Sequence, residues 1–166
     1  MRRNVLMLLA VVGVLGFVAC EDDDDDSNQF SANLTGAAEK PTAVTTTATG
    51  TFSVTDNGGS NITYLLNVNG LPQVASAAHI HVAPTRAGSL TLPAPADTFG
   101  GVVVNLNPAV NCQTCVLAQG TVVASQLSTG VSFDSVRALL NSGRAYVNVH
   151  TAANPAGHIR GNLTRN

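Results

Sequence analysis

Charged and aromatic side chains are scarce in this chain of 166 residues. Charged residues make up 11% of the sequence, aromatic residues make up 4%, and tryptophan is absent. The net charge is −2, and the few basic residues form no stripe that could follow a phosphate backbone. We therefore expect no nucleic-acid partner, because binding to nucleic acid depends on clustered lysine and arginine.

The sequence also lacks an apolar run of the roughly 20 residues that a membrane-spanning helix needs. The apolar run Asn4 to Ala19 follows two arginines and is typical of a signal peptide. It ends in F-V-A-C, which resembles a bacterial lipobox, although Phe17 stands where leucine is usual. We expect residues 1–19 to be a lipoprotein signal peptide and Cys20 to carry the lipid. Ordinary secretion and an uncleaved anchor are the alternatives.

After Cys20 comes an unbroken acidic run, Glu21 to Asp26. Like charges repel and keep such a segment extended, so residues 20–29 are expected to be the lipidated cysteine and a tether. Residues 30–166 remain as one domain, with six basic and four acidic residues. The sequence thus predicts an exported, membrane-anchored protein of the cell envelope, on its periplasmic or cell-surface side.

Cysteine is nearly absent from this body, which contains only Cys112 and Cys115 in the pattern C-Q-T-C. A second C-x-x-C, as in a zinc site, is missing, and no βαβ pattern surrounds the pair as in thioredoxin-like proteins. A small disulfide loop is favoured in an oxidising compartment, with a redox or metal-binding role as the alternative.

The body has the pattern of an all-β domain, because short runs rich in Val, Thr, Ile, Phe and Tyr alternate with turn residues. The turn signal Asp56-Asn57-Gly58-Gly59 predicts a hairpin, and residues 83–99, with three prolines, predict a long loop. We expect an antiparallel β-sandwich or Greek-key barrel of about eight strands. The expected strands are 30–34, 48–55, 60–68, 77–82, 101–106, 118–124, 145–150 and 158–163.

One segment departs from the strand pattern. Apolar residues at 133, 136, 139 and 140 have helical spacing, with Ser132 as an N-cap and Gly143 as a C-terminal stop. The sequence predicts one short helix near 132–142, packed against an end of the sheet.

All four histidines lie on the face of a predicted strand opposite its apolar face. His79 and His81 alternate with Ile80 and Val82, and His150 alternates with Val147 and Val149. The turn Asn154 to Gly157 would bring His158 to the same end as His150. If the strand of His79 and His81 pairs beside them, three or four imidazoles converge.

Imidazole ligands without thiolate or carboxylate suit copper(II) or zinc(II). The candidate ligands are therefore His79, His81, His150 and His158. Asn148, Tyr146 and Thr151 could orient their rings. Arg160, on the same predicted face, is expected to be structural or on the surface. The alternative for the histidines is a solvated sheet face that holds no ion.

Several motifs together resemble the CHRD, or chordin-type, domain. They begin with Leu34-Thr35-Gly36, Glu39-Lys40-Pro41 and Thr47-Ala48-Thr49-Gly50, and continue with Ala78-His79-Ile80-His81. They end with G-R-A-Y-V-N-V-H-T at 143–151 and N-P-A-G-H-I-R-G at 154–161. The resemblance implies an exported β-rich module without established catalytic activity. His158 departs from the family, which commonly has glutamate at this position. The C-Q-T-C segment is not part of the family pattern.

These observations predict a non-catalytic binding module whose ligand is a metal ion, an extracellular protein or a polymer. A structural or adhesive envelope module without metal is one alternative. An enzyme similar to copper–zinc superoxide dismutase is another, since it shares the H-x-H spacing on a β-sandwich, but the long zinc loop of those enzymes is missing. A G-x-S-x-G nucleophile motif is also missing.

Overall fold

The computed structural model describes residues 28–83, 100–108 and 111–166. The predicted signal peptide, Cys20, the acidic tether and nearly all of the proline-rich loop lie outside the described residues. The strands are β1 (Gln29–Thr35), β2 (Thr49–Asp56), β3 (Ile62–Asn69), β4 (Ala75–Val82), β5 (Val102–Asn105), β6 (Cys115–Thr121), β7 (Ala145–Thr151), β8 (Ile159–Asn162) and β9 (Thr164–Arg165). The helical elements are α1 (Phe133–Asn141) and the 3-10 turns η2 (Gly36–Ala38) and η3 (Ala124–Gln126).

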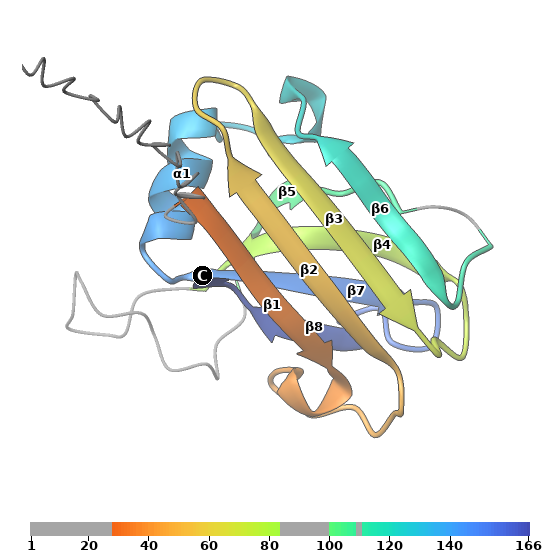
Figure 1. The fold of residues 1–166 in the computed structure, drawn as a ribbon. Coiled ribbons are helices and arrows are strands. Elements are labelled where there is room, and N and C mark those ends of the chain that lie inside the picture. The colour runs from red at the N-terminus through yellow and green to blue at the C-terminus, as the bar shows by residue number, and fades with distance from the viewer. Residues whose placement is uncertain (1–27, 84–99, 109–110) are drawn as a thin grey trace, which may run out of the picture.

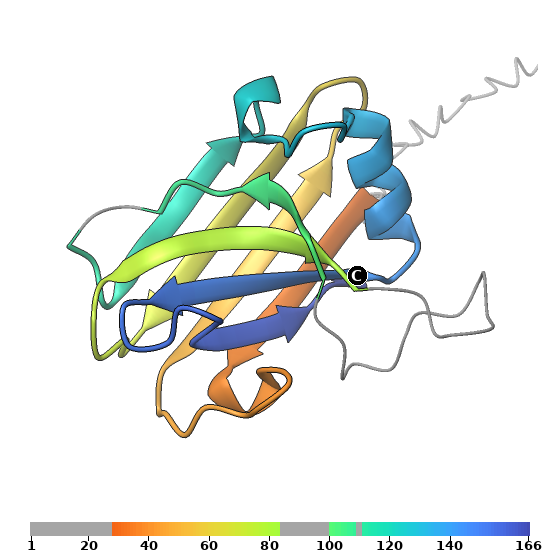
Figure 2. The same ribbon diagram turned by 180° about the vertical axis from the view of Figure 1, so that it is seen from behind.

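These strands form one antiparallel sheet in the order β5-β4-β7-β8-β1-β2-β3-β6, with β9 beside β1. The sheet curls on itself, so that β1, β2, β3 and β6 form one layer and β8, β7, β4 and β5 lie behind it (Figure 1). Figure 2 shows this second layer from its own side. The expected all-β antiparallel fold with one short helix is confirmed, as a single curled sheet.

Strand alternation places the core between the two layers. In β1 and β2 the buried residues alternate with more exposed ones, for example Phe30, Leu34 and Phe52. They meet the inward side chains of the opposite layer, such as Ile80 and Val147, each 0% exposed. A side-chain period of two with one face buried is the physical basis of this arrangement.

Local signals in the sequence explain the hairpin and the helix. The hairpin at Asp56 joins β2 to β3, with Gly58 and Gly59 at positive φ, where a side chain would be unfavourable. Ser132 caps α1 by accepting a hydrogen bond from the Ser135 amide at 3.1 Å. Both predictions are confirmed.

The predicted boundaries differ from the structure mainly in β6. The expected strand 118–124 is observed at Cys115–Thr121 because the chain leaves the sheet after Thr121 and turns through η3. Cys112 and Cys115, whose Cα atoms are 6.1 Å apart, form a disulfide that closes the turn leading into β6. The two-residue strand β9 was not predicted, since it is too short to give a pattern.

Strand β7 lies in the centre of its layer and is buried on both faces. All seven of its residues are buried, including the polar Asn148, His150 and Thr151. One face contacts the core. The other contacts the segment after η2 and the loop between β7 and β8, through the pairs Asn148–Glu39 and His150–Pro155. The interpretation as a solvated sheet face is therefore wrong for this strand, and its polar side chains lie in a second, polar interior.

Candidate metal centre

Three of the four histidines come together where β4 pairs with β7. In this antiparallel pair His79 is opposite Asn148, His81 is opposite Tyr146 and His150 is opposite Ala77. The three side chains share one face, and their ring centroids are 4.9–5.9 Å apart. His79, His81 and His150, called the histidine cluster below, offer ligand nitrogens that all lie within 4.8 Å of one another.

Backbone carbonyls fix the tautomers of two members of the cluster. His81 Nδ1 lies 2.9 Å from the Gly100 oxygen, and His150 Nδ1 lies 3.0 Å from the Pro155 oxygen. A carbonyl can only accept, so each Nδ1 carries the proton and each Nε2 keeps its lone pair. His150 Nε2 then accepts from His79 Nδ1 at 3.1 Å. His81 Nε2 is buried without a hydrogen-bond partner among the described residues.

Burial keeps these imidazoles neutral at pH 7. Desolvation, followed by the charges of His150 and His81, lowers the pKa of His79 from 6.5 to about 4. Desolvation also lowers the pKa of His81 and that of His150, although the carbonyl hydrogen bond of each ring opposes the shift. Neutral rings are the form that binds a metal, so the cluster needs little or no deprotonation before an ion enters.

The dimensions of the cluster suit one transition-metal ion. Two nitrogens that bind one ion with bonds of 2.0–2.1 Å can be at most about 4.2 Å apart. The separation of 3.1 Å between His79 Nδ1 and His150 Nε2 lies within this limit, and both atoms can bind one ion once His79 carries its proton on Nε2 instead. The longer separations in the group, up to 4.8 Å, have to shorten when an ion binds. Metal-binding histidines usually donate a hydrogen bond from their other ring nitrogen, often to a backbone carbonyl, as His81 and His150 do.

His158 lies in a separate hydrogen-bond network. Its Nδ1 is 2.7 Å from Asn154 Nδ2 and 3.2 Å from Thr151 Oγ1, and its Nε2 is 3.2 Å from Thr46 Oγ1. The amide of Asn154 donates to Nδ1, so the lone pair of this ring is already used. The structure thus brings together three of the four candidate ligands, and His158 instead joins the β7–β8 loop to the segment before β2.

Tyr146 and Arg160 support the ring of His81 from one side. The Tyr146 ring stacks on His81 with centroids 4.9 Å apart and an angle of 7° between the planes. The Arg160 guanidinium lies 3.6 Å from the Tyr146 ring centroid on a side chain that is 1% exposed. Arg160 is therefore structural and buried. Of the three predicted supporting residues, Tyr146 stacks on the cluster, whereas Asn148 contacts Glu39 and Thr151 contacts His158.

Glu39 is a functional candidate that the sequence reasoning missed. It is 2% exposed and accepts a hydrogen bond of 3.4 Å from Asn148 Nδ2. Desolvation raises the pKa of its carboxyl from 4.5 to about 7, although the charge of Arg160 opposes the rise. The available signal was an acidic residue in the short segment Ala37-Ala38-Glu39-Lys40-Pro41, in a body that has only four acidic residues.

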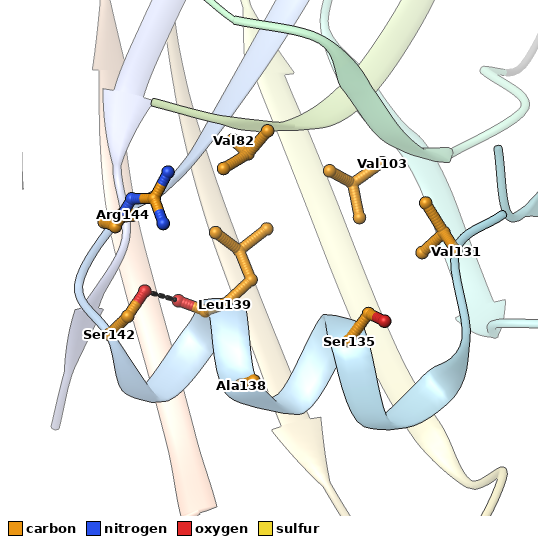
Figure 3. A pocket seen from close by; sticks show the side chains of 8 residues that line it. All are labelled: Val82, Val103, Val131, Ser135, Ala138, Leu139, Ser142 and Arg144. Carbon is orange, nitrogen blue, oxygen red and sulfur yellow. Dashed lines mark hydrogen bonds between the residues drawn. The ribbon is translucent and has the colours of Figure 1, made fainter. Parts of the chain in front are cut away.

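Cavities of about 400–490 Å³ lie in the described part of the chain. One of about 400 Å³ borders the cluster at His81 and is called the arginine cavity below, after Arg160. A second, of about 490 Å³, lies between segments 39–45 and 153–157. A third, of about 410 Å³, lies between α1 and the strands β4 and β5 and is lined mainly by valines and Leu139, with Arg144 at one side (Figure 3). The third has no group of metal-binding side chains.

Fold and site define the class of this protein as an all-β domain with a buried cluster of three neutral imidazoles on two neighbouring strands. The chain belongs to the CHRD domain family, whose model matches residues 30–163. Neither a curated protein nor a solved structure matches it significantly. In the described residues, no helix is long and apolar enough to cross a membrane.

Proposed function

We propose that this chain is an exported, lipid-anchored binding protein whose CHRD domain holds one copper(II) or zinc(II) ion on His79, His81 and His150. The observation that carries the proposal is the pair of hydrogen bonds from His81 and His150 to backbone carbonyls, which leave both Nε2 atoms as acceptors at one place. Such preorientation lowers the cost of ordering the ligands when an ion binds.

Copper is the preferred ion in this proposal. Nitrogen ligands bind copper(II) more tightly than zinc(II), and a neutral site of three imidazoles adds no charge that would favour a hard cation. The domain carries the ion without a catalytic role, in keeping with the family, and Cys20 supplies the membrane attachment.

The test is metal analysis of the full chain purified without a polyhistidine tag, followed by calorimetric titration with copper(II) and zinc(II). We expect one ion per chain and tighter binding of copper. His79→Gln should weaken copper binding by at least about 100-fold, because even changes to residues that only support ligands cost 10–100-fold.

His158→Gln is the matched control, since it changes the same residue type outside the cluster. It should leave copper affinity unchanged. Equal affinities of wild type and His79→Gln would refute the assignment. In that case the direct hydrogen bond between His79 and His150 would favour a metal-free structural module.

A further inference from the structure

Asn148 lies among the three rings of the histidine cluster in the register of β4 and β7. It is directly opposite His79, and His150 follows it two residues later on the same strand. His81 is opposite Tyr146, two residues before Asn148, and is therefore its diagonal neighbour. Side chains directly opposite have Cβ atoms about 4.5–5.5 Å apart, and diagonal neighbours lie within about 8 Å. The three imidazoles thus surround the Asn148 side chain on one face of the sheet.

The amide of Asn148 offers an acceptor that has no partner. The residue is 4% exposed, and its Nδ2 donates to Glu39 Oε2 at 3.4 Å. This bond uses the donor end of the amide. The other end, Oδ1, is buried and has no hydrogen-bond partner within the described residues. A buried polar atom without a partner is rare and costly, so its position is suited to a ligand.

His81 gives a second indication at the same place. Its Nε2 is also a buried acceptor without a partner in the part of the chain that the structure describes, because its proton is on Nδ1, facing the Gly100 carbonyl. Asn148 and His81 both line the arginine cavity. Each offers a lone pair there and no proton, so the two atoms together attract a cation and repel an anion.

An amide oxygen is chemically suited to complete such a site. Three imidazoles leave at least one coordination position open on a copper(II) or zinc(II) ion. Beside stronger ligands, copper accepts a weak axial oxygen from a side-chain amide or a backbone carbonyl. Such an oxygen adds no charge, so the site remains a neutral one.

We propose that Asn148 Oδ1 is the fourth ligand of the ion held by the histidine cluster. This assignment rests on the proposed function. The ion then takes two ligands from each strand, His79 and His81 from β4, and Asn148 and His150 from β7. Glu39 acts on the site indirectly, since its bond to Nδ2 fixes which end of the amide remains for the ion.

The experiment uses the full chain without a tag, with copper(II) as the probe. Calorimetry gives the copper affinity, and electron paramagnetic resonance gives the copper hyperfine splitting. Asn148→Leu should change the splitting and weaken copper binding by about tenfold, the lower end of the loss seen when residues around a metal site are replaced. Asn148→Asp keeps the shape and the oxygen and adds a negative charge. It should also change the splitting, but bind copper at least as tightly as wild type.

Asn67→Leu is the matched control, because it makes the same change on β3, where the amide donates to Thr51. It should leave copper affinity and splitting unchanged. Pulsed measurements in D2O detect a copper-bound water by its deuterons, and we expect none in wild type.

Two results would overturn the assignment of Asn148. One is a hyperfine splitting that is the same in wild type and Asn148→Asp, which also serves as the test if Asn148→Leu does not fold. The other is a copper-bound water in wild type, which would mean that water takes the position assigned to Oδ1. Failure of wild type to take up copper is seen before any variant is compared, and would refute the proposed function instead.

Discussion

Glu39→Gln tests the electrostatics of the polar interior beside β7. In the folded protein the Glu39 carboxyl is buried near Arg160 and Asn148, and desolvation raises its pKa from 4.5 to about 7. Glutamine has nearly the same shape and stays neutral at every pH. The variant therefore removes one titration and keeps most of the packing.

The sign of the effect follows from proton binding. Between pH 4.5 and 7 the folded state holds a proton on Glu39 that the unfolded state has released, so the free energy of unfolding falls as the pH rises. Each pKa unit corresponds to 1.36 kcal/mol, and the whole rise to about 3 kcal/mol. The histidines act in the opposite direction, because their pKa values are lowered and their contribution is lost as the pH falls below 6.5.

Urea unfolding of both proteins at several pH values, in the presence of a metal chelator, separates the two effects. The histidine contribution is common to wild type and variant and cancels in their difference. We expect the free energy of unfolding of wild type, relative to Glu39→Gln, to fall by about 3 kcal/mol between pH 4.5 and 7.5. A difference that does not change with pH would mean that the pKa of Glu39 is the same in the folded and unfolded states, and would refute the reasoning.

Two further predictions concern stability. Gly157→Ala should destabilise the domain by more than Gly120→Ala, since both glycines have φ of 146° but a Cβ on Gly157 would lie 2.5 Å from Glu39 and Asn148 atoms, whereas nothing lies within 4 Å at Gly120. Thermal unfolding should show a loss of about 1–3 kcal/mol from strain alone in both variants, and equal losses would contradict the close packing at Gly157. Replacing Cys112 and Cys115 together by serine should cost about 2 kcal/mol, the value for a very short loop, and a reducing agent should lower the unfolding midpoint of wild type but not of the double variant.

Periodicity predicted most of the fold because its signals are local. Strand alternation and the Asp56 turn identified the β2–β3 hairpin, and the spacing of Val136, Leu139 and Leu140 identified α1. The same alternation correctly placed His79, His81 and His150 on one face. The order of strands was not predictable in this way, because the pairing of β4 with β7 joins segments far apart in the sequence.

Local sequence patterns also could not predict which segments surround the site. A period of two separates the faces of a strand but does not reveal what covers the second face, so a solvated histidine face remained an open alternative. In the structure, the segment that contains Glu39 covers it. His158 shows the same limit, since its ring orientation depends on Thr46 and Asn154, which no strand pattern relates to it.

The pairing of β4 with β7 also determines when the cluster can exist during folding. His79 and His150 are 71 positions apart, and β7 is among the last strands of the chain. During synthesis, a chain whose β7 segment has not yet left the ribosome has only the His79–His81 pair. It cannot form the site of three nitrogens. Any ion bound by all three rings would stabilise the folded state by mass action. Because its ligands lie on both strands, it would stabilise the pairing of β4 with β7 in particular. The ion would then stabilise only those chains in which β7 has already paired with β4, so it would bind late in folding.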